Sequence, residues 1–150
     1  MSDDARVEAL AGHVNLIIRA LLVAGRSGAP AEGRIPFNPL YFNMLRCLDR
    51  EGAARPSRLA DMLLVPRTTI STAVKALAGR GLVATAADRQ DGRALSISLT
   101  EEGREILEAI LRQDRRNAAA MLSALAEEER DAFVAALGKV AKGVSGTPER

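Results

Sequence analysis

The sequence has one cysteine, one histidine and no tryptophan, and aromatic residues make up only 3% of its 150 positions. A single cysteine excludes an intrachain disulfide framework, and one histidine with one cysteine is too few for a zinc site with sulfur and imidazole ligands. We therefore expect neither a metal ion nor a cofactor. With so few aromatics, the core must be built from Leu, Val, Ile and Ala, which favours helices.

Long apolar runs are also absent, because no stretch approaches the roughly 18 apolar residues that a membrane-spanning helix requires. The first residues include Asp3 and Asp4, where a secretory signal would carry positive charge. We therefore expect a cytoplasmic protein with no membrane partner. Catalytic motifs are missing too: we find no nucleophile paired with a base and no glycine-rich phosphate loop, so the sequence argues against an enzyme.

Acidic residues are absent between Asp61 and Asp88, although the net charge of the whole chain is only +2. Residues 55–93 contain seven Lys or Arg against three Asp or Glu, whereas residues 1–54 have six of each and residues 94–150 have eight against ten. The excess positive charge therefore lies in the middle segment, where it would attract a polyanion such as DNA.

Hydrophobic periodicity predicts a long amphipathic helix from about Val7 to Gly25, followed by a Gly- and Pro-rich linker over residues 25–39. A second helix is expected over residues 39–51. Two further short helices follow in close succession, one opened by Pro56 and one running from about residue 67 to 78. Two helices of this size joined by so short a turn resemble a helix-turn-helix.

The helix over residues 67–78 has two distinct faces. At 100° per residue, its apolar face contains Ile70, Val74 and Leu77. The opposite face carries short hydroxyl side chains and one lysine, which suit a surface that enters a DNA major groove about 12 Å wide. A generic solvated helix remains the alternative.

Residues 82–88 (LVATAAD) and 94–99 (ALSISL) are typical of two strands joined by the loop RQDGR at 89–93. Behind a helix-turn-helix, such a hairpin is a wing, and its arginines would reach the DNA backbone or the minor groove. A plain β-turn with solubilising charges is the alternative. Asp91 lies two residues before Arg93 and can orient its guanidinium through an ion pair.

These residues resemble the multiple-antibiotic-resistance (MarR) family of winged-helix regulators. Asp91-x-Arg93, Leu99-Thr100 and Gly103 match the family's D-x-R-x5-L-T-x-x-G signature, and residues 57–83 are similar to its helix-turn-helix. The resemblance implies a homodimer with interlocking N- and C-terminal helices, whose affinity for DNA is often lowered by a small ligand or by oxidation. Pro66 departs from the family, because Ser or Thr usually caps the recognition helix there.

The candidate DNA contacts lie on the predicted recognition helix and on the wing. They are Arg67, Thr68, Thr69, Ser71, Thr72 and Lys75 on the helix, and Arg89, Asp91 and Arg93 on the wing.

Candidate sensor residues are fewer. His13, Tyr41 and Arg46 lie on helices that border the ligand pocket in the similar family. The preferred interpretation, however, is that His13 is a polar position on the first helix and Tyr41 a partly buried core residue. Cys47 is interpreted first as a small buried hydrophobe, with a redox sensor as the alternative.

The sequence therefore predicts a mainly α fold with a small β-hairpin wing, a winged helix-turn-helix, in which the N- and C-terminal helices form a dimerisation region. The helix that Thr100 opens and a last helix near 127–141 carry more apolar surface than a small winged-helix core covers, although burial within a monomer is the alternative. The expected regions are dimerisation helices and linker at 1–38 and 104–142, the DNA-binding region at 39–103, and a disordered tail at 143–150. The expected function is a dimeric repressor that binds a pseudo-palindromic site on double-stranded DNA, and a winged-helix dimer that binds other proteins is the alternative.

Overall fold

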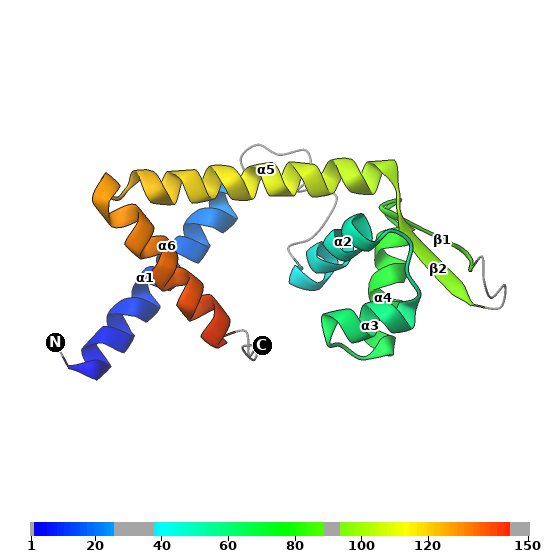
Figure 1. Ribbon diagram of the computed structural model, residues 1–150, viewed down its shortest axis with the longest axis horizontal. Helices are drawn as coiled ribbons and strands as arrows, with labels where there is room; N and C mark the ends of the chain where they lie inside the picture. The colour runs from blue at the N-terminus through cyan, green and yellow to red at the C-terminus, as the bar shows by residue number, and fades with distance from the viewer. Residues whose placement is uncertain (1, 26–37, 89–93, 145–150) are drawn as a thin grey trace. The chain divides into compact units, whose positions relative to one another are not determined.

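The computed structural model describes residues 2–25, 38–88 and 94–144, except the side chains of residues 22–25. The described elements are, in chain order, α1 (Asp3–Gly25), α2 (Pro39–Glu51), α3 (Pro56–Leu63), α4 (Arg67–Ala78), β1 (Val83–Ala87), β2 (Leu95–Leu99), α5 (Glu101–Ser123) and α6 (Glu127–Val144) (Figure 1). They confirm the predicted mainly helical fold with one antiparallel hairpin. The chain divides into two compact units, residues 1–113 and 114–150, with the boundary inside α5.

Capping residues at both ends explain why α2 begins and ends where the sequence predicts. Before α2, the Asn38 side chain accepts a hydrogen bond from the Leu40 N–H at 2.9 Å, and Pro39 occupies the first turn, where its missing N–H costs nothing. After α2, Gly52 has a φ of 77° and donates its N–H to the Leu48 carbonyl. In the part of the chain that is described, no helix is both long and apolar enough to span a bilayer.

The turn between α3 and α4 contains a strained leucine. Leu64 has φ 54° and ψ 43°, the left-handed conformation that non-glycine residues rarely adopt, and 91% of its surface is exposed. Its backbone N–H donates to the Ala60 carbonyl and so closes α3. Nothing in the sequence marks this strain, because leucine is not a usual turn residue.

Leu64→Gly is therefore expected to raise the free energy of unfolding by about 0.5–1 kcal/mol. Glycine relieves a left-handed strain of about 1–2 kcal/mol and adds back roughly half of that as chain entropy. Because the leucine side chain is almost fully exposed, little hydrophobic burial is lost. Urea unfolding at equal protein concentration measures the change, and a destabilised glycine variant would contradict the assigned strain.

The core of the winged region is entirely apolar. It contains Met44, Leu45, Leu48, Ala54, Leu59, Ala60, Ile70, Ala73, Val74, Leu77, Leu82, Val83, Ile97, Ile106 and Leu107, and no polar or charged residue is buried among the described side chains. These residues come from α2, α3, α4, the hairpin and the first turns of α5, and from the connecting segments at Ala54 and Leu82. As predicted from the composition, aliphatic side chains form the core, whereas Tyr41 and Phe42 are half-buried against it. The helices α2, α3 and α4, the hairpin and the start of α5 thus share one core.

The hairpin pairs Val83 with Leu99 at its base and Ala87 with Leu95 toward its tip. A third segment joins it, because Ala54 exchanges two backbone hydrogen bonds of 2.9 Å with Ile97. Of the alternating residues in β2, Ile97 is buried, whereas Leu95 remains 45% exposed. The hairpin is therefore anchored in the core at its base and leaves the core toward its tip.

The corner between β2 and α5 explains the Leu-Thr-x-x-Gly part of the sequence signature. The Thr100 hydroxyl donates to the Gly81 carbonyl at 2.7 Å and accepts from the Gly103 N–H at 2.9 Å, so it caps α5 as predicted. The Thr100 N–H donates to the Leu82 carbonyl at 3.2 Å. Gly103 is buried, and a Cβ there would collide with the Leu82 carbonyl oxygen. This position accepts only glycine, because the backbone of α5 packs directly on the backbone of Leu82, the residue before β1.

In the second unit, Arg130 stabilises the turn between α5 and α6. Its Nε donates to the Leu122 carbonyl in the last turn of α5 at 3.0 Å, and its Nη2 donates to the Leu125 carbonyl in the following turn at 3.3 Å. The Glu129 carboxylate accepts from the Ala126 N–H at 3.0 Å and caps α6. α6 extends to Val144, two residues into the expected disordered tail; residues 145–150 lie outside the described residues.

Candidate nucleic-acid interface

The two faces of α4 are arranged as the helical angle predicts. Ile70, Val74 and Leu77 are buried in the core, whereas the opposite face is exposed and carries Thr68, Ser71, Thr72 and Lys75. Arg67 is also exposed, at the first position of the helix. A face of short polar side chains therefore projects from a helix whose other side is fixed in the core.

Two hydroxyls on this face are already engaged as donors. Ser71 Oγ donates to the Arg67 carbonyl at 3.0 Å, and Thr72 Oγ1 donates to the Thr68 carbonyl at 3.1 Å. Because each hydroxyl has one hydrogen and two lone pairs, both oxygens keep acceptor capacity toward a ligand. The amino group of Lys75 is instead a pure donor. The face thus presents acceptors and a donor at separate positions.

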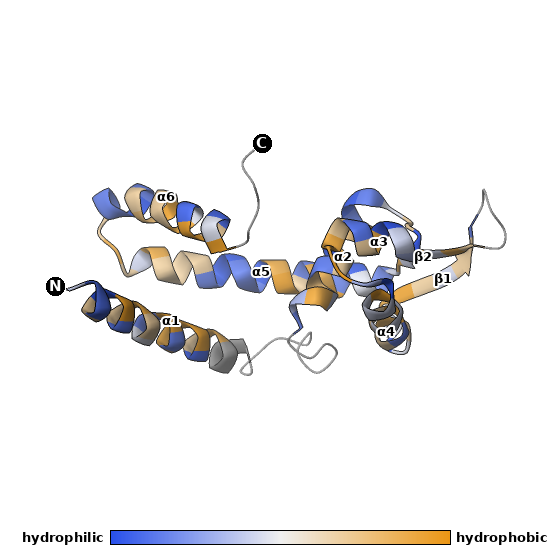
Figure 2. Ribbon diagram, turned by 90° about the horizontal axis from the view of Figure 1, so that it is seen from below, coloured by the Kyte–Doolittle hydropathy of each residue, from blue (hydrophilic) through white to orange (hydrophobic). Residues whose placement is uncertain are grey.

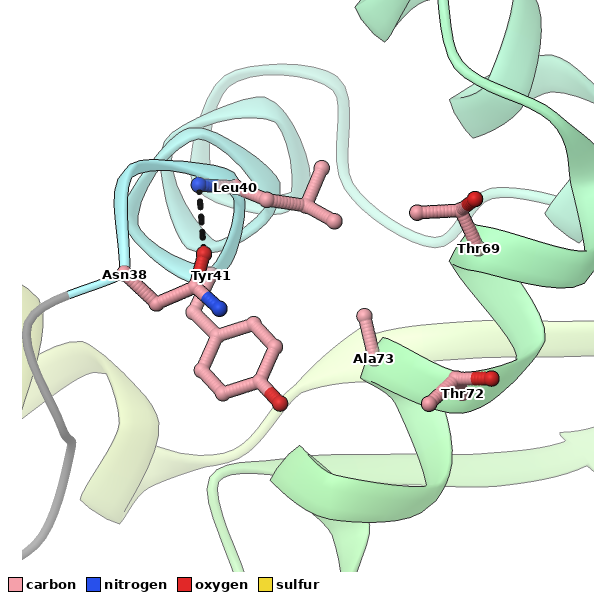
Figure 3. Close-up of a pocket in the computed structure, with 6 residues that line it drawn as sticks. All are labelled: Asn38, Leu40, Tyr41, Thr69, Thr72 and Ala73. Carbon is pink, nitrogen blue, oxygen red and sulfur yellow. Dashed lines mark hydrogen bonds between the residues drawn. The ribbon is translucent and has the colours of Figure 1, made fainter.

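Thr69 differs from the other candidate contacts on α4. It is half-buried and lines a shallow hollow of about 290 Å³ together with Leu40, Tyr41 and Ala73 (Figure 3). Thr72 reaches the rim of the same hollow, and the remaining lining residue is Asn38. Thr69 therefore lies at the edge of the exposed face, between α4 and the start of α2.

Several charges of the basic segment are paired within the protein. Arg55 forms a two-bond contact with Asp88, and Arg58 contacts Glu51 at 2.9 Å. These pairs join residues 33 and 7 positions apart, so composition alone could not show them. Arg67, Lys75 and Arg80 are exposed on or next to α4. The exposed face of α4 itself therefore carries two positive side chains, Arg67 and Lys75.

The expected wing contacts Arg89, Asp91 and Arg93 lie outside the described residues. The structure describes the strands that lead to them. The Asp88 N–H donates to the Ala94 carbonyl at 2.8 Å, one step beyond the last pair of β1 and β2. Residues 89–93 thus connect two backbone positions that are hydrogen-bonded to each other.

The candidate sensor residues are not brought together in one site. Tyr41 lines the hollow beside α4. Arg46 is exposed, and its Cζ lies over the Phe42 ring, 5.6 Å from the ring centroid. His13 is exposed on α1. Cys47 is a half-buried free thiol that packs against the core. Among the described residues, no cluster of His, Cys, Asp and Glu has the arrangement of a metal site.

Comparison with known proteins gives a consistent result. Residues 35–94 match the sequence profile of the MarR family. The chain is 30% identical over 131 residues to the HTH-type transcriptional regulator MT0903.1 of Mycobacterium tuberculosis, covering 87% of each chain. It is 33% identical over 115 residues to the HTH-type transcriptional repressor YetL of Bacillus subtilis, covering 77% of this chain and 66% of YetL.

The fold is likewise found among solved structures. The structure of a MarR family protein from Bacillus stearothermophilus superposes with a TM-score of 0.68 at 24% identity. That match covers 97% of this chain and 99% of the other. The helix order and the hairpin described above are therefore shared over nearly the whole length of both chains.

Proposed function

Because the chain belongs to the MarR family of helix-turn-helix transcriptional regulators, we propose that it binds a specific double-stranded DNA site as a homodimer and represses transcription there. One observation carries the DNA-binding part. The exposed face of α4 is polar, narrow and without acidic side chains, while its other face is fixed in the core. Residues 39–103 are the proposed DNA-binding region.

In this proposal α4 enters the major groove. The acceptor oxygens of Ser71 and Thr72 suit the exocyclic amino groups of adenine or cytosine, and the Lys75 amino group suits guanine O6 and N7 or a phosphate. Thr68 shares this face, Arg67 supplies charge at its beginning, and Thr69 contributes from the edge. The hairpin brings Arg89 and Arg93, steadied by Asp91, toward the adjacent minor groove.

Dimerisation is supported by apolar side chains that the single chain leaves exposed. On α1 they include Val7, Leu10, Val14, Leu16, Ile17 and Ile18, which are 39–68% exposed. On α6, Val134, Leu137 and Val140 are 49–55% exposed. Each helix shows hydrophobic residues repeating along its length (Figure 2). So much exposed apolar surface is typical of a protein interface, so we assign residues 1–38 and 104–142 to dimerisation.

The proposed repressor role is supported by one relative and by the expected geometry of a dimer on DNA. A dimer seated on two successive major grooves covers a promoter sterically, and YetL is named a transcriptional repressor. Release by a small ligand and a redox role of Cys47 remain predictions. Tyr41 and Thr72 line the same hollow, so a small molecule bound there would lie against the proposed DNA-contacting face of α4.

Lys75→Ala is expected to weaken binding to the preferred duplex by roughly tenfold, because the variant loses the lysine on the exposed α4 face. If Lys75 contacts a phosphate, the slope of log affinity against log salt also falls by about 1. Lys139→Ala removes another exposed lysine, on α6 and outside the proposed DNA contacts; measured at concentrations at which both variants are dimeric, it is the control and should bind as the wild type does. Equal affinities of the two variants would remove Lys75 from the interface.

The salt dependence of the wild type separates the two candidate functions. DNA binding releases counterions, so log affinity should fall steeply as log salt rises. A flat dependence, or no duplex binding at low salt, would favour the alternative of a winged-helix dimer that binds other proteins.

A further inference from the structure

A bidentate ion pair joins the hairpin to the segment that precedes α3. Arg55 Nε donates to Asp88 Oδ2 at 3.1 Å, and Arg55 Nη2 donates to Oδ1 at 2.9 Å. The side chain of Asp88 is 17% exposed and that of Arg55 is 40% exposed. A guanidinium that holds both carboxylate oxygens fixes the orientation of the contact as well as its length.

The position of this pair in the hairpin indicates what it does. Asp88 follows the last residue of β1, and its N–H bonds to the Ala94 carbonyl, so it closes the described end of the hairpin. Ala54, the neighbour of Arg55, is bonded through its backbone to Ile97 at the buried middle of β2. Arg55 is therefore tied to the core through its neighbour and to the far end of β1 through its own side chain.

The ion pair is a tertiary contact that supports the hairpin, because an isolated two-stranded hairpin is only marginally stable in water. Its far end has little other support: Ala84, Thr85, Ala86 and Ala87 are exposed, and Leu95 is 45% exposed. The ion pair therefore lies at the end of β1 whose residues are exposed and are not packed in the core. Between Ile97 and the end of the described hairpin, the ion pair therefore adds to the backbone ladder.

We propose that Arg55 and Asp88 are a positioning pair for DNA binding, which sets the direction in which β1 and β2 approach the duplex beside α4. Neither side chain needs to contact DNA, since each is engaged with the other. The inference rests on the proposed function, because it assumes that the hairpin side of the molecule meets DNA.

Charge and positioning make opposite predictions for one substitution. Asp88→Asn removes a negative charge near a polyanion and leaves the Arg55 guanidinium available to phosphates. If charge alone mattered, this variant would bind DNA more tightly. If the pair positions the hairpin, the variant binds more weakly despite its more favourable charge. The sign of the change therefore distinguishes the two roles.

The experiment compares full-length wild type and Asp88→Asn on a duplex selected with the wild type, at one salt concentration. We expect roughly tenfold weaker binding for Asp88→Asn, the loss typical of one misplaced contact group. The thermal midpoint should stay near the wild-type value, because partly exposed ion pairs contribute little stability. Asp61→Asn removes an exposed carboxylate on α3 and is the matched control, with unchanged or tighter binding expected.

Arg55→Lys provides a second test that does not depend on the folding of the first variant. It keeps the positive charge but cannot hold both carboxylate oxygens in a planar fork, so binding should again weaken. Unchanged or tighter binding by both variants overturns the positioning role. Failure of the wild type to bind any duplex would instead overturn the proposed function, so the two failures are distinguishable.

Discussion

Replacing Gly103 with alanine is expected to lower the free energy of unfolding by more than about 3 kcal/mol. The new Cβ would collide with the Leu82 carbonyl oxygen and would lie 2.8 Å from Leu99 Cδ1. The Leu82 carbonyl cannot easily move, since Leu82 is fully buried and its carbonyl accepts the Thr100 N–H. The helix must therefore shift away from the strand, and the Thr100 cap must break.

Urea unfolding at matched protein concentration measures this loss. Gly12→Ala is the control, because a Cβ at Gly12 meets nothing within 4 Å and alanine is the better helix former. That variant should be stabilised by about 0.5–1 kcal/mol. A Gly103→Ala protein as stable as the wild type would show that the corner between β2 and α5 is not packed as described.

Leu10→Arg is expected to weaken dimerisation about a hundredfold or more. Leu10 is 61% exposed in the single chain, so an arginine there leaves the folded chain intact. In the proposed interface, the same arginine would be buried without a partner, which costs about 3 kcal/mol or more. Operator affinity should fall with dimerisation, because a lone protomer holds only one half-site.

Sedimentation equilibrium gives the dimer dissociation constant for this comparison. Leu64→Arg changes another leucine, 91% exposed, in the turn between α3 and α4, and should leave the dimer constant unchanged. A Leu10→Arg protein that remains dimeric at wild-type concentrations would place the interface elsewhere.

The sequence predicted best those features that short-range chemistry decides. Glycine and proline mark both ends of α2, and the angular pattern of α4 separates its buried and exposed faces. Thr100 was expected to open α5, and its hydroxyl does cap that helix. Each of these depends on residues within one or two turns, so periodicity and capping preferences suffice.

Features that depend on distant segments could not be predicted. The Arg55–Asp88 pair joins positions 33 apart, and the 2.7 Å contact of Arg104 with Asp49 joins positions 55 apart. The left-handed Leu64 and the carbonyl contacts of Arg130 likewise arise from how the chain turns. Gly103 belonged to the recognised signature, but only the approach of Leu82 gives its physical reason. The wing contacts at 89–93 remain predictions.

Selection of preferred duplexes from a random pool by the full-length protein tests the central claim most directly. The proposed dimer predicts enrichment of an inverted repeat whose half-site centres lie about one helical turn, or 10–10.5 base pairs, apart. Enrichment should disappear with Leu10→Arg and weaken with Lys75→Ala. A pool that shows no sequence preference at low salt, or that yields only a single asymmetric site bound by one protomer, would contradict the account.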